Sequence, residues 1–407
     1  MERALDICIV GYGTAGQAAA LFLRRQGHRV EIFERAPQLG PVGAGLLLQP
    51  TGLAALADLG LFDAALACGE PVDQLLGSNT RGRVVMDMHY QRLDPHWFGL
   101  GIQRGALFTL LQDSHTAAVR CGVTIAAVDS DTGSIRDSDG NTYGTYDLVL
   151  VTTGAASNLR PPELVRRDRA YPWGAIWCLC DDPSREFSRQ LLQRYDKARR
   201  MAGILPVGRL PGDSAQTRKL SFFWSLPRCE LSGILERGLD AWRAEVVAYW
   251  PQTETLLSTL THVGQLAAAN YRDAVLRRFY QGRVAYLGDA AHAMSPQLGQ
   301  GANMALLDAQ AIAEALAREA DVPQALRAFD RERRRHVRIY QLLSRWLTPI
   351  FQSELDWAAS LRDALMGPVG RAPIARGEML KVLAGIKRGF FGSLPRRPLP
   401  KRTNTPT

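Results

Sequence analysis

The chain has 407 residues, a formal net charge of +9 and an apolar fraction of 46%. That length exceeds one ordinary hydrophobic core, so we expect two or three domains. No apolar run approaches the ~20 residues of a membrane span, and no signal peptide is recognisable. Six scattered cysteines without a CxxC pair argue against a zinc site. We therefore expect a cytoplasmic globular protein without bound metal.

The positive charge is uneven, with arginines crowded between residues 331 and 338 and basic residues in excess after residue 371. No aromatic-rich basic motif accompanies this charge, which argues against nucleic acid as a partner. Solvated helix faces and a basic tail are the simpler interpretation. Contact with an anionic membrane or an acidic partner is the alternative.

The first forty residues carry the strongest local signal. A strand over Asp6–Val10 runs into the turn GYGTAG, and an apolar helix follows to about Arg25. In this pattern Gly11 allows a tight turn, Gly13 lets a pyrophosphate approach the backbone and Gly16 lets the helix pack on the sheet. The helix N-terminus favours an anion. A second strand ends at Glu34, which can accept hydrogen bonds from an unphosphorylated ribose, so FAD or NAD is expected rather than NADP.

A second nucleotide-site segment lies far downstream, at residues 282–316. A strand over Val284–Leu287 precedes Gly288-Asp289, at the strand end where open α/β sheets bind ligands. Pro296, a turn containing Gly299 and Gly301, and a helix from about Ala302 follow. This helix N-terminus also faces an expected anion.

These segments together resemble the class A, single-component flavoprotein monooxygenases, the family of p-hydroxybenzoate and salicylate hydroxylases. The resemblance implies that Asp289 binds the ribityl chain of FAD and that the turn Gly299–Asn303 places backbone N–H groups against the flavin pyrimidine. The glycine-rich segment 40–61 and Gln103-Arg104 are similar to further FAD-contacting segments of this family. The residues expected to contact FAD are Gly11, Gly13, Thr14, Ala15, Gly16, Glu34, Arg35, Gly45, Arg104, Asp289, Gly299, Gly301, Ala302 and Asn303.

The loop after the strand YDLVL departs from the family pattern. The family carries Gly-Ala-Asp-Gly-x-x-Ser-x-x-Arg, and here Gly154, Ser157 and Arg160 match while Thr153 stands where the aspartate is expected. The motif is implicated in handling both FAD and NAD(P)H. A mild effect of Thr153, electron delivery by another route and a largely inactive relative are the three alternatives.

The middle of the chain reads as an antiparallel sheet inserted into the FAD-binding domain. Aromatic strands are expected at 171–180, 201–210 and 219–227, helices over 230–260, and further strands within 72–99. The resemblance implies that this sheet covers the flavin and keeps water from a flavin C4a-hydroperoxide. Candidate substrate contacts are Trp177, Trp224 and Pro296. Alternation along the strand leaves open which face meets the flavin, and His292 is expected to be structural.

Two apolar helices divided by prolines are expected after residue 345, the second basic and amphipathic and followed by a proline-rich tail. Packing of this segment on the FAD-binding domain is the simpler interpretation, and a peripheral membrane or homodimer contact is the alternative. The fold class we predict is α/β: a Rossmann-like FAD-binding domain, an inserted antiparallel substrate sheet and C-terminal helices. The predicted parts are 1–71, 100–165 and 275–345 for FAD, 72–99 and 166–274 for substrate, and 346–407 for the C-terminal segment.

The resemblance implies an FAD-dependent monooxygenase that hydroxylates an aromatic or heteroaromatic small molecule, with O2 as co-substrate and NADH or NADPH as electron donor. The alternatives are a flavoprotein of the same fold that uses externally reduced flavin, one that performs a non-hydroxylating oxidation or halogenation, and a flavin-binding module without turnover. No catalytic side chain is assigned, because the cofactor carries the reactive oxygen.

Overall fold

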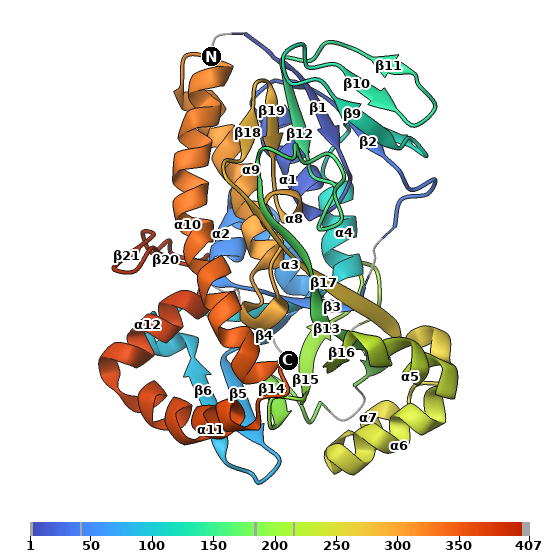
Figure 1. The fold of residues 1–407 in the computed structure, drawn as a ribbon, viewed down its shortest axis with the longest axis vertical. Helices are drawn as coiled ribbons and strands as arrows, with labels where there is room; N and C mark the ends of the chain where they lie inside the picture. Colours follow the sequence, from blue (N-terminus) through green and yellow to red (C-terminus); the bar gives the residue numbers. More distant parts are fainter. Residues whose placement is uncertain (1–2, 41–42, 183–184, 215, 401–407) are drawn as a thin grey trace.

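A parallel sheet with helices packed on it forms the upper half of the molecule (Figure 1). The computed structural model describes residues 3–40, 43–182, 185–214 and 216–400. All neighbouring strands of this six-stranded sheet are parallel except the edge pair β18–β19. In spatial order the strands are β18 (Tyr280–Gln281), β19 (Val284–Tyr286), β12 (Leu148–Val151), β1 (Asp6–Val10), β2 (Arg29–Glu34) and β8 (Ala118–Cys121).

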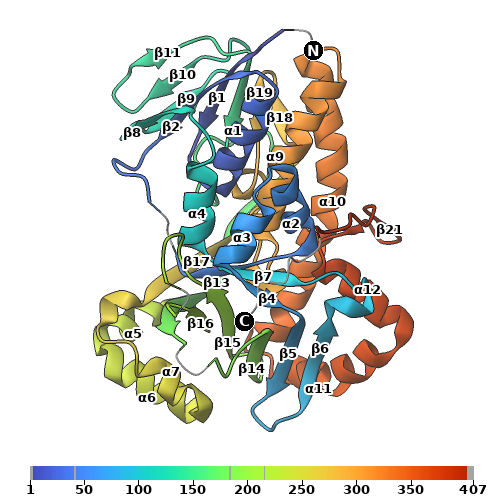
Figure 2. The same cartoon turned by 180° about the vertical axis from the view of Figure 1, so that it is seen from behind.

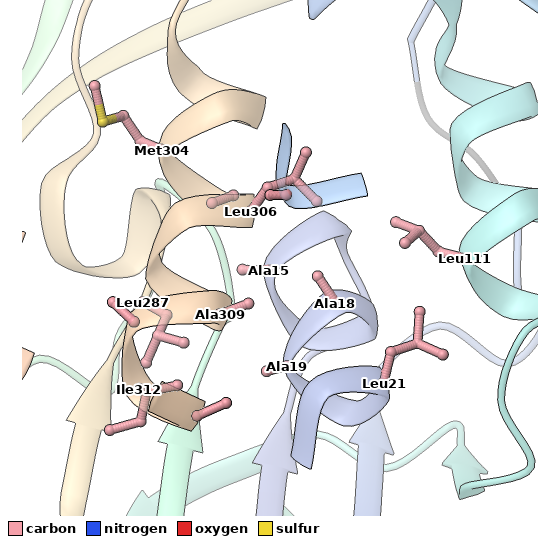
Figure 3. Packing of buried hydrophobic residues seen from close by; sticks show 14 of the residues in the cluster. Ala15, Ala18, Ala19, Leu21, Leu111, Leu287, Met304, Leu306, Ala309 and Ile312 are labelled. Carbon is pink, nitrogen blue, oxygen red and sulfur yellow. The ribbon is translucent and has the colours of Figure 1, made fainter. Parts of the chain in front are cut away.

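Helices α1 (Thr14–Arg25) and α9 (Gly301–Arg318) pack side by side, although they lie far apart in the sequence. Figure 3 shows the reason: Ala15 and Ala19 turn small side chains toward the contact, where α9 supplies Leu306 and Ala309. Small residues let the helices approach closely and so bring the two glycine-rich turns together. The other helices of this half are α2 (Pro50–Asp58), α3 (Phe62–Cys68), α4 (Arg104–Gln112), α8 (Asp289–His292) and α10 (Val322–Phe351).

A seven-stranded sheet forms the lower half, and both segments predicted as insertions contribute strands to it. Neighbouring strands are antiparallel except for the parallel pair β14–β5. The predicted fold class, with its inserted sheet and C-terminal helices, is confirmed. The spatial order is β17 (Ala267–Leu276), β13 (Val165–Asp181), β16 (Lys219–Pro227), β15 (Arg200–Gly208), β14 (Gln190–Asp196), β5 (Gln74–Asn79) and β6 (Val84–His89).

The two faces of this sheet have different partners. One face packs on α5 (Leu231–Arg237), α6 (Leu239–Tyr249) and α7 (Glu254–Leu257), which lie at its outer side (Figure 2). The opposite face meets a small sheet that belongs to the upper half. That sheet has the order β3 (Gly45–Leu48), β7 (Gly99–Gln103) and β4 (Glu70–Val72). A β9–β11 meander (residues 125–143) lies beside β2.

The C-terminal segment differs from its predicted boundary. Helix α10 continues unbroken to Phe351, so a boundary at residue 345 falls inside it. Helices α11 (Asp356–Arg371) and α12 (Pro373–Leu383) and the hairpin β20 (Lys387–Arg388)–β21 (Gly392–Ser393) follow. In the described part of the chain, no helix combines the length and apolarity that crossing a bilayer requires.

Candidate active site

The first glycine turn joins β1 to α1 and is fixed by packing. A Cβ at Gly16 would lie 2.1 Å from the Gly11 carbonyl oxygen, and one at Gly11 would lie 2.8 Å from the Thr152 carbonyl oxygen. The Thr152 hydroxyl donates to the carbonyls of Val10 (3.0 Å) and Gly11 (2.8 Å). A Cβ at Gly13, by contrast, would meet nothing within 4 Å. Gly11 and Gly16 are therefore required by the fold, while Gly13 leaves its backbone open to a ligand.

Polar groups surround this turn. The Glu34 carboxylate, at the end of β2, accepts hydrogen bonds from the backbone N–H groups of Tyr12 (2.7 Å) and Ala36 (2.9 Å). Its remaining lone pairs can accept from a ribose diol. Thr14 is half-buried at the start of α1, and the Arg35 side chain is exposed. The turn therefore combines an anion-binding helix end with a fixed acceptor.

The second glycine turn, at the end of β19, lies against the first. A Cβ at Gly288 would come 3.2 Å from the Ala15 Cβ, and the φ of Gly288 is +58°, a conformation that favours glycine. The next residue, Asp289, is exposed and begins α8. The two predicted turns therefore lie side by side.

A buried ionic network fixes the second turn. Asp308 is fully buried on α9 and accepts from the Gly288 N–H (2.8 Å), His292 Nε2 (2.6 Å) and Arg333 Nε (2.7 Å). Burial opposes its charge, but His292 and Arg333 outweigh burial and hold the pKa of Asp308 at about 2. His292 therefore makes the structural hydrogen bond expected of it.

The network extends to the C-terminal segment. Arg333 Nη1 donates to His336 Nδ1 (2.7 Å), and His336 Nε2 contacts the Gly385 carbonyl oxygen (2.8 Å). Because a guanidinium can only donate, Nδ1 must be the acceptor and Nε2 must carry the proton. Burial, together with the nearby Arg333 charge, lowers the pKa of His336 well below its ordinary value. His336 is therefore neutral at pH 7.

The N-terminus of α9 presents backbone N–H groups. A Cβ at Gly301 would meet nothing within 4 Å, and Gly299 adopts the left-handed conformation. Ala302 is half-buried, whereas the Asn303 side chain is fully buried, accepts from the Gln49 N–H (2.8 Å) and donates to the carbonyls of Leu47 and Gly299 (3.3 Å each). Asn303 can therefore offer a ligand only its backbone, while its side chain ties α9 to β3.

Arg104 and Gly45 occupy neighbouring segments. The exposed Arg104 side chain lies against Gly43, and its charge acts on the Tyr271 phenol. A Cβ at Gly45 would come 2.5 Å from Val207 and 2.7 Å from Ser221, so Gly45 lets β3 pack closely on the seven-stranded sheet. This contact between β3 and the seven-stranded sheet brings the seven-stranded sheet next to the glycine turns.

The loop after β12 is organised without a carboxylate at position 153. The Thr153 hydroxyl donates to Ser157 Oγ (2.5 Å). Arg160 is buried and donates to the carbonyls of Ala155 (2.8 Å), Asp289 (3.0 Å) and Ala290 (2.7 Å). Arg160 therefore joins this loop to the second glycine turn, mainly through neutral acceptors.

Trp177 lies on the sheet face that turns toward β3. Its indole is half-buried, packs on Phe223 with ring centroids 5.0 Å apart and donates to the Tyr271 hydroxyl (3.0 Å). The register of β13 against β17 shifts between Ala170 and Gly174, close to Tyr271, and such bulges re-aim side chains. Burial raises the pKa of Tyr271 to about 12, so its phenol keeps a proton to donate.

Trp224 lies on the other face, which corrects the prediction that it contacts substrate. Its side chain is 1% exposed and packs edge-to-face on Tyr249 of α6, with ring centroids 4.9 Å apart. Strand alternation sends Trp224 away from Phe223, so it belongs to the helix-covered core. Pro296 is half-buried in a short 3₁₀ turn, residues 296–298, beside the second glycine turn.

Comparison with known proteins identifies this arrangement. The sequence pattern described as "FAD binding domain" matches residues 4–142 and 230–341, more than half of the chain. The chain belongs to the FAD binding domain family. It is 28% identical over 375 residues to an aurachin C monooxygenase/isomerase of Stigmatella aurantiaca, covering 90% of this chain and 94% of that protein. It is also 28% identical over 380 residues to a 3-hydroxybenzoate 6-hydroxylase of Aquipseudomonas alcaligenes, covering 89% and 93%.

Solved structures share the fold of the chain. A Klebsiella pneumoniae protein solved with FAD and uric acid superimposes with a TM-score of 0.75 at 21% identity, covering 93% of this chain and 97% of that one. A 2-methyl-3-hydroxypyridine-5-carboxylic acid oxygenase gives a TM-score of 0.74 at 21% identity, covering 94% and 98%.

The residues present suit FAD. The open backbone at Gly13 and Gly301 would admit a pyrophosphate and a flavin ring, because no protein atom occupies the space that their side chains would take. The Gln49 amide nitrogen is buried without an acceptor in the described part of the chain, and it lies 4.0 Å from the Cβ position of Gly299. A bound ring with carbonyl oxygens would supply that acceptor.

Sequence reasoning missed several residues of the FAD region. Thr152 and Gln49 carried no signal, because single polar residues beside a strand are common. Tyr271 was missed because no alternation pattern marks a residue in a bulge. Arg333 could have been found, since an arginine on the apolar side of a predicted helix needs a buried acid as partner.

Proposed function

We propose that the chain is an FAD-dependent monooxygenase that hydroxylates a small aromatic or heteroaromatic molecule, with O2 as co-substrate and NAD(P)H as electron donor. The observation that carries the proposal is that an aromatic sheet face, with Trp177 and Tyr271, is placed next to the FAD-binding turns by β3. The relatives named as a monooxygenase and a hydroxylase support the reaction class.

FAD, when bound, supplies the redox and oxygen chemistry, so the protein's residues have to bind, orient and exclude water. Glu34 would hold the adenosine ribose, and the first turn of α1 and Arg104 the phosphates. Asp289 would bind the ribityl chain. The N–H groups at the start of α9 would face the flavin pyrimidine, where the helix dipole stabilises negative charge.

Substrate orientation falls to the sheet face. Trp177 and Phe223 provide apolar aromatic surface against which a ring can pack. Tyr271 accepts from Trp177 and keeps its own proton, so it can donate one hydrogen bond to a hydroxyl, carbonyl or ring nitrogen. The Trp173 Nε1 and Ser221 Oγ atoms are buried without partners among the described residues, and each could meet a polar substituent.

The test is rapid mixing of the FAD-loaded protein with NADH or NADPH, with and without a panel of phenols and hydroxylated heteroaromatics. We expect bleaching of the flavin absorbance that an effective aromatic accelerates, followed in air by one hydroxylated product per nicotinamide oxidised. Reduction without hydroxylation of any aromatic would contradict the proposal, as would purification of a chain that cannot be loaded with FAD.

A second candidate is a flavoprotein of the same fold that receives reduced flavin from outside. The observation in its favour is Thr153, which replaces the expected aspartate and closes its loop through Ser157. Slow bleaching by both nicotinamides, with turnover on supplied reduced flavin, would favour this candidate. Thr153→Asp then tests the loop: the added carboxylate should accelerate nicotinamide-dependent reduction, while Thr153→Ser should leave it unchanged.

A further inference from the structure

Helix α11 exposes an apolar face on the surface of the substrate half. Trp357, Leu361, Leu365 and Val369 are spaced by four residues, and each side chain is between 47% and 67% exposed. Ile374, at the start of α12, is 86% exposed. The opposite side of α11 packs against the protein, because Ala358, Ala359 and Arg362 are buried. A contiguous apolar stripe of this kind marks an interaction surface rather than scattered exposed residues. We call these five exposed residues the α11 face.

A second apolar projection lies on the same side of the molecule. The turn between β20 and β21 carries Phe390, which is 61% exposed, and Phe391, which is fully exposed. The hairpin and α11–α12 project from the same side in both views (Figures 1 and 2). The apolar side of α12, in contrast, is buried through Leu380 and Leu383. The predicted amphipathic helix therefore packs on the protein, and α11 and the hairpin are the exposed elements.

The charges beside the α11 face are cationic and lack ion pairs. Arg83 donates to the Ala364 carbonyl oxygen of α11, and Arg371 and Arg376 flank Ile374. Within the described ranges, none of these three arginines has a carboxylate within 4.0 Å, whereas Asp356 and Asp363 of α11 are ion-paired. One unpaired acid, the exposed Glu354, precedes the helix. The side chains around the α11 face that lack an ion pair therefore carry a net positive charge.

A cavity of about 160 Å³ lies between β6, α11 and α12. Arg371 and Arg376 line it, together with a third arginine, Arg92. Methionines line it, and they adapt to flexible ligands. A ligand that carries a phosphate group would meet several guanidinium donors there. The lining includes one acid, Asp87, which contacts His89, together with Met86, Met88, Met366, Met379, Arg92, Arg371 and Arg376.

We propose that the α11 face and the Phe390–Phe391 turn dock the protein onto an anionic lipid bilayer, with α11 lying in the plane of the interface. Aromatic and leucine side chains on one face, with arginines at its border, are the composition of interfacial helices. A second copy of the chain fits less well, because a two-fold contact would set the same patch, arginines included, against itself. Anionic headgroups would pair those arginines instead.

Flotation of the FAD-loaded full chain with phosphatidylcholine vesicles, with or without phosphatidylglycerol, tests the proposal. We expect binding only when the anionic lipid is present, and weaker binding as salt rises. Replacing Trp357, Leu361 and Leu365 by serine should abolish flotation without changing flavin content. Replacing Arg371 and Arg376 by serine should weaken binding about fivefold for each arginine removed.

The matched control replaces Leu210 and Val263, each 39% exposed but outside the α11 face, by serine. This control should float like the unaltered protein. The proposal is overturned if the protein ignores anionic vesicles, or if the serine variants float unchanged. It is also overturned if sedimentation shows a dimer that the triple serine variant dissociates while neither protein binds lipid, since the face would then join two copies.

Discussion

The two glycine turns and the seven-stranded sheet are built from different kinds of interaction. At the turns, the backbone packs so closely that a Cβ at Gly11 or Gly16 would overlap a neighbouring carbonyl oxygen, and a single carboxylate, Asp308, satisfies three donors. On the sheet, the face toward β3 is made of side chains that pack on one another, such as Trp177 and Phe223. The turns therefore tolerate few residue types, whereas the sheet face can change its side chains and keep its fold. In the proposed function, the first region binds the cofactor and the second varies with the substrate.

The largest effect is expected at Asp308. Asp308→Asn removes the counterion of the buried Arg333, and an uncompensated buried charge costs about 3–5 kcal/mol of unfolding free energy. The measurement is chemical denaturation with and without FAD. Asp321→Asn, in the exposed cap of α10, is the control and should cost less than about 1 kcal/mol, because Asn keeps the oxygen that accepts from the Gln324 N–H. A loss at Asp308 no greater than that of the control would contradict the importance of this network.

Replacement of the two tryptophans should separate the faces of the sheet. Trp224→Ala leaves a cavity in the helix-covered core and should lower the unfolding free energy by about 3–5 kcal/mol. Trp177→Ala should cost less stability but weaken binding of an aromatic ligand about tenfold, because it removes a ring partner and the bond to Tyr271. Denaturation and ligand titration measure both. If Trp224→Ala mainly altered ligand affinity, the assignment of faces would be wrong.

Substitution of two glycines of the first turn should likewise separate an effect on stability from an effect on ligand binding. Gly16→Ala places a Cβ 2.1 Å from the Gly11 carbonyl oxygen, so we expect a loss of about 1–3 kcal/mol even without FAD. Gly13→Ala has open space around its Cβ, so it should leave the stability of the FAD-free protein unchanged and weaken FAD affinity. Denaturation of the FAD-free protein and FAD titration distinguish the two. Equal destabilisation by both substitutions would contradict the assignment of Gly16 to the fold and of Gly13 to ligand binding.

The smallest effect is a pH dependence at His336. Its pKa in the folded protein lies well below the unfolded value of 6.5, so the unfolded chain takes up the extra proton. Its contribution to stability is therefore complete above pH 6.5 and decreases as the pH falls, by at most about 1.4 kcal/mol per pH unit. His336→Gln should flatten the stability curve between pH 6.5 and 5. Identical slopes for both proteins would show that His336 is not neutral in the folded state.

The sequence predicts what is set by local rules. Both glycine turns, Glu34 and Asp289 follow from spacing along strands and helices, and the strands of the inserted sheet follow from apolar runs. The facing of Trp224 does not follow, because alternation gives two faces without saying which is covered by α5–α7. The position of Tyr271 cannot be predicted for a related reason, because a bulge interrupts the alternation. The bare face of α11 was equally hidden, because its apolar spacing matches that of a buried helix.

The attachment of Gln300 to the C-terminal segment bears on how the protein is made. The Gln300 amide donates to the carbonyls of Val382 (3.3 Å) and Leu383 (2.8 Å), and His336 contacts the Gly385 carbonyl. During synthesis the first glycine turn leaves the ribosome long before the second, and the carbonyls that hold Gln300 follow it by 82 and 83 residues. We therefore expect a nascent chain to expose the first glycine turn alone for a long stretch of elongation, and to retain the coenzyme only after residues 382–385 have been translated.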